Sequence, residues 1–459
     1  MAKAKVYWMD DRSNSLLTSL AYKGAALFEQ AGLNECFDKG DRVAVKCHMG
    51  VWGTTHYLRP FLIRVICDKI KEYGGQPFVT DTTTVNFTPF DSRVLAQDYL
   101  FTAAAHGFTQ ESMGCPILIA DGEAGLDDVK IEVPNPIFTK HAYGARGIVN
   151  ADAMIVVSHF KGHPMGVFGG AIKNIGIGCQ SKRGKMMVHL TTHPDYGLAS
   201  ELFVFSGEAC GGLQGCPWGP EVAKTCETNC PTGAVKVLED HMEWDRSLCI
   251  GCFGHVLFPL ACGVWSIPDE FLKMMPITMG ETASAIVNYM GKDRVGYINF
   301  AIDVSPWCDC VDWADRAILP NLGVFASRDM VAADLAVLDM TMKKLGIEGS
   351  AAEELFAMEE EKEKFTICGG LLGNIPQWIQ CNVVRELGMG STDYELIEGD
   401  PYMDYRKCWF PRNSPEKPLG QYLKKAWDGV EVTPPEGFEY LPKLRISYEE
   451  LSKRPSKEE

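Results

Sequence analysis

Short apolar runs alternate with amphipathic segments over the first third of the chain. Continuous runs of this kind are typical of strands that are buried on both faces of a sheet. They occur at residues 42–47, 77–80, 116–120 and 154–158. Residues 58–73 carry apolar side chains at helical spacing, and a Gly-Gly pair follows where that helix would end. Strands separated by helices predict an α/β fold, with a mostly parallel sheet flanked by helices.

The periodic pattern stops near residue 206. From there to residue 269 the chain is rich in Gly, Pro, Cys and Trp and has little periodicity. A segment of this size cannot bury much core of its own, and such segments often fold around a metal. We therefore predict a small, Cys-rich insert that folds around a metal.

Alternation resumes beyond the insert. Residues 295–301 and 322–326 are predicted strands, and Ser327 or Asp329 caps the helix that follows. The insert thus interrupts an α/β domain and does not follow it. The predicted organisation is a discontinuous core of residues 1–205 and 270–345, an insert of residues 206–269, and a C-terminal extension of residues 346–459.

The C-terminal extension differs from the core in composition. Residues 353–364 are strongly charged and predict a helix, and the remainder is loop-rich. We expect the extension to cap a cleft or to form the contact of a homo-oligomer.

Composition narrows the classes of function. The chain has 459 residues, of which 46% are hydrophobic and 23% charged, as in a globular protein. Its formal charge is −16 and it has no basic block, so nucleic acid and anionic membranes are poor candidate partners. No secretory signal precedes the first predicted strand, and no apolar run reaches the ~18 residues of a membrane span. We expect a cytoplasmic protein.

Cysteine spacing carries the most specific chemical information. The chain has 17 cysteines, which in the cytoplasm serve as metal ligands, redox groups or small core residues. Cys226-x3-Cys230-Pro231 is the closing half of a bacterial ferredoxin motif, and Cys249-x2-Cys252 is the opening half of a second one. In such pairs, the cysteine before proline ligates the cluster of the other motif.

Half of the expected ligands are missing from these motifs. The remaining ligand positions hold Pro220, Ala223, His255 and Pro259. One cluster would keep only Cys226. The other would keep Cys230, Cys249 and Cys252, and we predict one [4Fe–4S] cluster on these, with His255 as fourth ligand by register. Other candidates for the fourth position are Cys216, Cys226 and Cys262. If none binds, one iron could act as a Lewis acid. Zinc, or a thiol-rich loop without metal, is the alternative.

Polar residues follow several of the predicted strands, where open α/β sheets bind ligands. The stretch after residue 158 adds glycines that let the backbone approach a ligand, and lysines that supply positive charge. It matches neither nucleotide-binding fingerprint. The predicted catalytic residues are Lys46, His48, Lys161, His163 and Lys173, and the predicted cofactor-binding residues are Asp81, Gly169, Gly170 and Asn174. Together they would suit a small anionic substrate.

Two further patterns leave alternatives open. His159 and His163 are four residues apart and could share a helical face and a metal, but Pro164 and the glycines favour a loop. Cys308-Asp309-Cys310 is compatible with metal ligation, a redox pair or a packed turn, and its spacing alone slightly favours the packed turn.

With these passages the sequence resembles the iron–sulfur family known as domain of unknown function 362. The resemblance covers roughly residues 40–345 and is carried by residues 156–176, by the insert and by residues 303–334. It implies an α/β fold similar to the N-terminal part of nickel-dependent lactate racemase, a ferredoxin-type module and an anaerobic setting. It implies no particular reaction. The chain departs from the family in its lost cysteines and in Cys47-His48, where a Pro-Asn pair is usual.

Three functional hypotheses remain. The favoured one is a cytoplasmic iron–sulfur oxidoreductase, whose cluster acts on a small anionic substrate and whose redox partner is a ferredoxin or a flavoprotein. The second is a non-redox isomerase, racemase or lyase that moves a proton next to a carboxylate. The third is an electron-transfer or assembly protein without catalysis of its own. A protein of this kind does not need a large domain with a cleft, which counts against this hypothesis.

Overall fold

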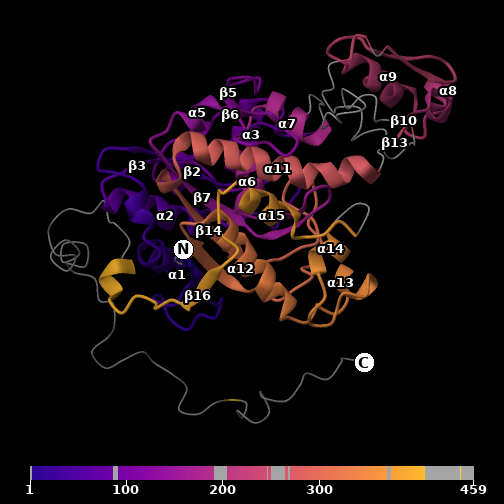
Figure 1. Ribbon diagram of the computed structural model, residues 1–459. Coiled ribbons are helices and arrows are strands. Elements are labelled where there is room, and N and C mark those ends of the chain that lie inside the picture. Colours follow the sequence, from indigo (N-terminus) through magenta and orange to yellow (C-terminus); the bar gives the residue numbers. More distant parts are fainter. Residues whose placement is uncertain are drawn as a thin grey trace. The chain divides into compact units, whose positions relative to one another are not determined.

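A single sheet of eight strands runs through the core in the order β16-β1-β15-β14-β7-β2-β3-β4 (Figure 1). The strands are β1 (Ala4–Met9), β2 (Arg42–Lys46), β3 (Gln76–Asp81), β4 (Ile117–Ile119), β7 (Ala153–His159), β14 (Val295–Ala301), β15 (Gly323–Ser327) and β16 (Tyr394–Glu398). The computed structural model describes residues 3–85, 91–190, 204–245, 247–249, 264–266, 269–369, 374–408 and 445.

The sheet is mostly parallel, as the apolar runs predict. Strands β14, β7, β2, β3 and β4 pair in parallel, and β1 pairs in parallel with β16. Strand β15 runs antiparallel to both of its neighbours, β14 and β1. The carboxyl ends of the five parallel strands therefore meet along one edge of the sheet.

Both faces of the sheet are buried, which explains why its central strands are apolar throughout. On β2, Val43 and Val45 belong to one hydrophobic core, whereas Ala44 belongs to the other. Helices α1 (Leu20–Gln30) and α2 (Pro60–Glu72) pack into the first core. The second core receives α6 (Ala171–Gly176), α11 (Asp269–Met290), α12 (Met330–Met342) and α15 (Ile379–Glu386), as Figure 1 shows.

Shorter elements complete the core. They are α3 (Ala96–Ala105), α4 (Gln110–Met113), α5 (Arg146–Val149), α7 (Lys182–Leu190), α13 (Ala351–Glu354), α14 (Lys364–Cys368) and the pairs β5 (Asp128–Glu132) with β6 (His141–Ala145) and β8 (Lys161–His163) with β9 (Val167–Gly169). None of the helices in the described part of the chain combines the length and hydrophobicity that crossing a bilayer requires.

The predicted insert has its own small elements. Its two ends pair through β10 (Val204–Phe205) and β13 (Trp265–Ser266), so the chain leaves and re-enters at one place. Between them lie α8 (Gly212–Gly215), α9 (Pro220–Thr228) and the antiparallel pair β11 (Val235–Val237) with β12 (Met242–Trp244).

The segment beyond residue 346 differs from the sequence-based prediction. The single charged helix predicted at residues 353–364 is wrong, because the chain turns between α13 and α14. Phe356 and Glu361 have positive φ angles of 60° and 62°, and the Glu361 amide bonds to the end of α12 at Met342 O, 2.6 Å away. Strand β16 pairs with β1, so part of this segment is built into the main sheet.

One buried carboxylate ties three elements of the second core together. Asp334 of α12 accepts hydrogen bonds from the amides of Ala171 and Ile172 at the start of α6 (2.7 and 2.9 Å) and from Asn299 Nδ2 on β14 (2.8 Å). A Cβ atom on Gly170 would lie 2.5 Å from Asp334 Oδ1, so only glycine fits there. Burial raises the pKa of Asp334 to about 6, and the group is therefore ionised at neutral pH.

We expect Asp334→Ala to lower the free energy of unfolding by on the order of 3–5 kcal/mol, because three buried donors lose their acceptor. The control is Asp339→Ala on the same helix, which removes one half-buried bond to the Tyr394 hydroxyl and should have a smaller effect, of about 1 kcal/mol. Urea unfolding followed by circular dichroism measures both. Equal losses for the two variants would contradict the role given to Asp334.

Candidate functional site

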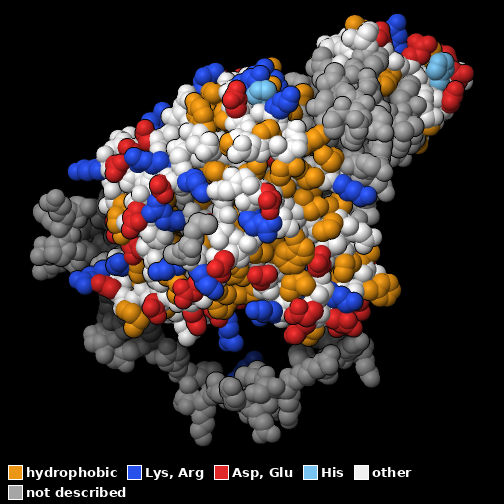
Figure 2. Space-filling model, viewed as in Figure 1, with side chains coloured by type: hydrophobic (Ala, Val, Ile, Leu, Met, Phe, Trp, Pro, Cys, Tyr) orange, Lys and Arg blue, Asp and Glu red, His pale blue; other side chains and the backbone are white. Residues whose placement is uncertain are grey.

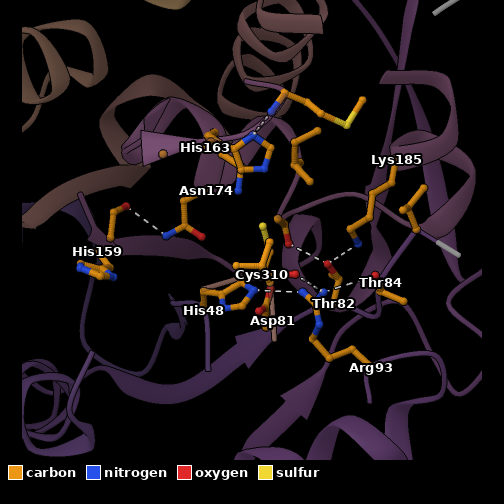
Figure 3. Close-up of a pocket in the computed structure, with 18 of the residues that line it drawn as sticks. His48, Asp81, Thr82, Thr84, Arg93, His159, His163, Asn174, Lys185 and Cys310 are labelled. Atoms are coloured by element: carbon orange, nitrogen blue, oxygen red, sulfur yellow. Dashed lines mark hydrogen bonds between the residues drawn. The ribbon is translucent and has the colours of Figure 1, made fainter. Parts of the chain in front are cut away.

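A cleft lies at the carboxyl ends of the parallel strands, where the sequence predicts it (Figure 3). Lys46 ends β2, Asp81 ends β3 and His159 ends β7. The cavity has a volume of about 170 Å³, which suits a small organic ligand. Its polar lining consists chiefly of Lys46, His48, Asp81, Asp91, Arg93, His159, Lys161, His163, Lys173, Asn174, Lys185, His189 and Cys310.

Positive charge dominates the cleft. Five of the described lining residues are lysine or arginine, and two are carboxylates. On the molecular face that Figure 2 shows, in contrast, Lys and Arg side chains lie among Asp and Glu. The concentration of cations is thus inside the protein and not on that surface. Buried charges are retained only where partners compensate them, so the cleft favours an anionic ligand.

The Lys46–Asp81 pair forms one wall of the cleft. Lys46 Nζ lies 2.8 Å from Asp81 Oδ1, and both side chains are buried. Lys46 also donates to Asn174 Oδ1 at 2.7 Å, and Tyr99 donates its hydroxyl hydrogen to Asp81. Burial alone would raise the pKa of Asp81, but the Lys46 charge outweighs it and lowers that pKa to about 2. Asp81 is therefore a fixed anion that orients Lys46.

A second buried ion pair lies at the end of the neighbouring strand β7. Asp309 Oδ1 lies 2.8 Å from His159 Nδ1, and Asp309 Oδ2 lies 3.2 Å from Lys161 Nζ. His159 also donates through Nε2 to the carbonyl oxygen of Ile302, at 2.7 Å. Although burial opposes ionisation, the His159 and Lys161 charges hold the pKa of Asp309 well below its usual range. Because both His159 nitrogens are engaged, His159 and His163 do not share a metal.

Lys173 differs from the other lysines that line the cleft. In the part of the chain that the structure describes, no acceptor forms a hydrogen bond or ion pair with its amine. Burial, reinforced by the positive charge of Lys161, lowers the pKa of Lys173 to about 7. Burial likewise lowers the pKa of Lys185 to about 8. At neutral pH, Lys173 can therefore both accept and donate a proton.

Three other histidines of the cleft, His48, His163 and His189, are neutral bases at pH 7. Burial lowers the pKa of His48 to about 3 and that of His189 to about 4. Burial and the charge of Lys173 hold the pKa of His163 well below 6.5. The distance between His48 Nε2 and Arg93 Nη1 is 3.0 Å. His48 Nδ1 accepts a hydrogen bond from the Gly50 amide.

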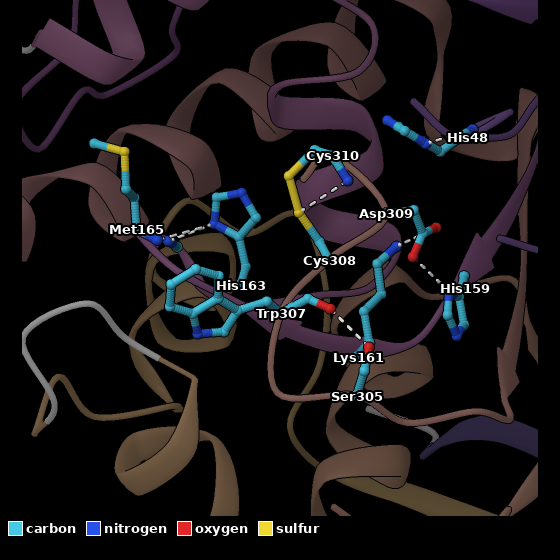
Figure 4. The surroundings of a disulfide bond; sticks show 12 residues. His48, His159, Lys161, His163, Met165, Ser305, Trp307, Cys308, Asp309 and Cys310 are labelled. Atoms are coloured by element: carbon cyan, nitrogen blue, oxygen red, sulfur yellow. Dashed lines mark hydrogen bonds and ion pairs between the residues drawn. A yellow bond between two sulfur atoms is a disulfide. The ribbon is translucent and has the colours of Figure 1, made fainter. Parts of the chain in front are cut away.

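Two cysteines lie close to His163. Cys308 and Cys310 are joined by a disulfide in the loop that follows β14 (Figure 4). One potential ligand atom from each of His163, Cys308 and Cys310 lies within 4.8 Å of the other two, so these residues form a possible metal-binding group. Cys310 lines the cleft, whereas Cys308 is buried.

The structure brings the nine predicted cleft residues together at one place, and their roles toward a ligand stay predictions. Sequence reasoning missed Arg93, Lys185 and His189. Lys185 and His189 lie four residues apart on α7, a spacing that could have indicated a shared polar face. Arg93 lies in the long connection after β3, where no pattern distinguishes it.

The predicted cluster ligands are only partly within the described residues. Outside the described residues lie Cys252, His255 and Cys262. Cys226 lies in the last turn of α9, and Cys230 follows the end of that helix. The Ala234 amide lies 3.2 Å from Cys230 Sγ, and the Thr232 hydroxyl lies 3.6 Å from it. Partial burial raises the pKa of Cys230, but these donors outweigh it and lower the pKa below its usual value. Cys230 is therefore suited to ligate a metal as a thiolate.

Comparison with known proteins gives a family and distantly similar solved structures. The model of a family described as a domain of unknown function, DUF362, matches residues 43–339. No curated protein matches the chain. The lactate racemase apoprotein from Thermoanaerobacterium thermosaccharolyticum aligns with a TM-score of 0.27 and 12% sequence identity, over 55% of this chain and 61% of that chain. The alignment thus spans less than two thirds of the racemase structure.

We expect Lys46→Met to lower the free energy of unfolding at pH 7 by on the order of 3–5 kcal/mol, because Asp81 then stays buried without its partner. The pKa of Asp81 is about 2 in the native protein and ~3.9 when unfolded, so the pair contributes fully above about pH 4 and is lost as the pH falls toward 2.

In the Lys46→Met variant the pKa of Asp81 should instead rise above its unfolded value. The difference in stability between the native protein and the variant should then shrink between pH 7 and pH 4.5 in urea titrations. A difference that stays constant over this range would contradict the assignment. Lys3→Met, in an exposed pair with Asp393, serves as the control and should change little.

Proposed function

The chain belongs to the DUF362 family, and from this premise we propose that it is an iron–sulfur oxidoreductase that binds a small anionic substrate in its lysine-lined cleft. The single observation that carries the proposal is Lys173, a half-buried lysine whose amine has no partner among the described residues and has other cations around it. Such a group is stabilised by an anion that enters the cleft.

The other lysines of the cleft are held in place by their partners and add positive charge around the bound anion. Lys161 is paired with Asp309 and Lys46 with Asp81, so these lysines are held in place and add positive potential. Lys185 donates to Thr82 Oγ1 at 2.5 Å and to the Gln180 carbonyl at 2.6 Å. An anionic group bound next to Lys173 would raise the pKa of that amine and keep it protonated. A carboxylate and a phosphate both meet this requirement.

Proton transfer is the chemistry that the residues of the cleft supply. With a pKa of about 7, Lys173 can take a proton from a bound substrate or deliver one to it. Arg93 and Lys161 add fixed positive charge for negative charge that develops on the substrate. The narrow cavity limits the water that can compete for these protons.

The redox part of the proposal rests on the insert. Cys230, Cys249 and Cys252 would hold one [4Fe–4S] cluster, which supplies single electrons when bound. The donors around Cys230 Sγ support thiolate ligation at this position. A ferredoxin or a flavoprotein would be the redox partner. The proposed setting is a reducing cytoplasm, since the buried thiols Cys36, Cys67 and Cys179 form no disulfide.

A second function is favoured by one specific observation. The pKa of about 7 for Lys173 suits abstraction of a proton next to a carboxylate, with no net oxidation. An enzyme of this kind would exchange solvent deuterium into a small 2-hydroxy acid without any reductant, whereas the oxidoreductase would require one.

We expect the protein purified without oxygen to contain about four iron and four sulfide per chain, as one [4Fe–4S] cluster requires. Cys230→Ser should lose most of both, because a cluster ligand is removed. Cys36→Ala, a buried thiol of the main core, is the matched control and should keep them. Iron and sulfide assays with an absorption spectrum measure the outcome; a metal-free native protein, or zinc in place of iron, would refute the cluster.

We expect small carboxylates or phosphate to bind more weakly as the pH rises through about 7, because Lys173 then loses its charge. Lys173→Ala should weaken binding at least about tenfold, or ~1.4 kcal/mol. The exposed Lys344→Ala is the control. Isothermal titration calorimetry at pH 6 and pH 8 tests this, and equal affinity of the native protein and Lys173→Ala would refute the binding site.

A further inference from the structure

The two cysteines of the Cys308–Cys310 disulfide differ in exposure, since one lines the cleft and the other is buried. Cys310 lines the cavity and is partly exposed, whereas Cys308 is 2% exposed and does not line it. An accessible sulfur next to a buried one is the arrangement that thiol–disulfide exchange needs, because a partner can attack only one of the two.

The loop that carries the pair is held firmly. Asp309, between the two cysteines, is bound to His159 and Lys161 at 2.8 and 3.2 Å. The Gly162 amide donates to the Ser305 carbonyl at 2.9 Å, and a Cβ atom on Gly162 would lie 1.8 Å from the Pro306 carbonyl oxygen. The hairpin of β8 and β9 therefore packs directly on this loop, and the position of the sulfurs is determined by buried contacts.

The hydrogen bonds of His163 oppose a role as metal ligand. Its Nδ1 accepts from the amides of Met165 and Gly166, at 3.2 and 2.7 Å, so the hydrogen of the neutral ring is on Nε2. Metal-bound histidines show the reverse polarity, since the second nitrogen donates its hydrogen. Figure 4 shows the ring edge away from Met165 directed toward the cysteines. His163 is thus placed to donate a hydrogen bond to a sulfur.

The surroundings of Cys310 are those of a reactive thiol. Lys161, Lys173 and Arg93 line the same cleft, and Arg93 donates to the Cys310 carbonyl oxygen at 3.4 Å. The Cys310 amide lies 3.3 Å from Cys308 Sγ, so this bond favours a thiolate on Cys308 and not on Cys310. Partial exposure next to several cations characterises redox-active cysteines. The same cations attract an anionic partner.

We propose that Cys308 and Cys310 are a redox pair that reduces small disulfides bearing carboxylate groups, with Cys310 as the attacking and Cys308 as the resolving sulfur. The proposal rests on the anion-binding cleft proposed above and identifies the reacting group within it. His163 is a positioning residue that donates a hydrogen bond to the pair.

The exchange proceeds in two balanced steps. The Cys310 thiolate attacks one sulfur of the substrate disulfide; the substrate S–S bond breaks, and the first substrate thiolate leaves and takes a proton from water. The Cys308 thiolate then attacks Cys310 Sγ in the mixed disulfide, which releases the second thiolate and forms the Cys308–Cys310 bond. Each cysteine releases its proton to water before it attacks, and the second substrate thiolate, like the first, takes a proton from water. In sum, two electrons pass from the protein dithiol to the substrate, and the two protons are exchanged through water. An external dithiol restores the reduced pair by the reverse exchange.

The test uses the full chain, reduced with a phosphine and freed of reductant under anaerobic conditions. It is mixed either with 3,3′-dithiodipropionate, which carries two carboxylates, or with the neutral 2-hydroxyethyl disulfide. Alkylation and mass spectrometry follow the loss of the free Cys308 and Cys310 thiols. We expect the pair to re-form at least about tenfold faster with the carboxylate reagent, and Lys173→Ala to reduce this ratio. Lys344→Ala is the control and should keep it.

Cysteine variants separate the two sulfurs. Cys308→Ser should accumulate a mercaptopropionate adduct on Cys310, whereas Cys310→Ser should form no adduct at Cys308. An adduct on Cys308, or none on Cys310, overturns the proposal. So does stoichiometric zinc or nickel binding by the reduced protein that Cys310→Ser abolishes, because the cysteines would then be metal ligands.

Failure of this inference can be distinguished from failure of the proposed function. If calorimetry detects anion binding that depends on Lys173 but the reduced pair does not re-form, the redox pair is refuted and the anion site stands. If the pair re-forms at equal rates with both reagents and calorimetry detects no anion binding that depends on Lys173, the anionic substrate is refuted, and the proposed function is refuted with it.

Discussion

Asp309 is the group on which the arrangement of the cleft depends. Its carboxylate, buried between His159 at the end of β7 and Lys161 on β8, joins the loop after β14 to the neighbouring strand and hairpin. This one contact positions Lys161, presents Cys310 to the cavity and engages His159 away from His163. A buried carboxylate without these cations would be strongly destabilising, so the ion pairs and the local backbone geometry support each other.

The cleft carries an excess of charge that the rest of the molecule stabilises. Two hydrophobic cores, one on each face of the sheet, surround the parallel strands whose ends form the site. Asp334 anchors the start of α6, the helix that carries Lys173 and Asn174. The apolar interior thus holds unpaired or partly paired cations in fixed positions, and their burial is what brings the pKa of Lys173 near neutrality.

Much of this scaffold could be predicted from sequence because it depends on local patterns. The apolar runs at residues 42–47 and 154–158 became β2 and β7, and Asp329 caps α12 as expected. The carboxyl-end rule led to Lys46, Asp81 and Lys161, since parallel strands bring their ends to one edge. The prediction of a helix at residues 353–364 was wrong, because the hydrogen bond from the Glu361 amide to the end of α12 overrides the local helical preference of this charged segment.

The sequence alone was sufficient to predict the central strands and most of the polar residues at their carboxyl ends, because hydrophobic period and strand direction are local properties of the chain. It also determined the ferredoxin-like spacing of Cys226, Cys230 and Cys249. Only the tertiary structure decided that Arg93 and Lys185 join the cleft, that Lys173 lacks a partner among the described residues while Lys46 has one, and that Cys310 faces His163. These outcomes depend on distances between residues far apart in the chain, and no local pattern encodes which buried charges will meet.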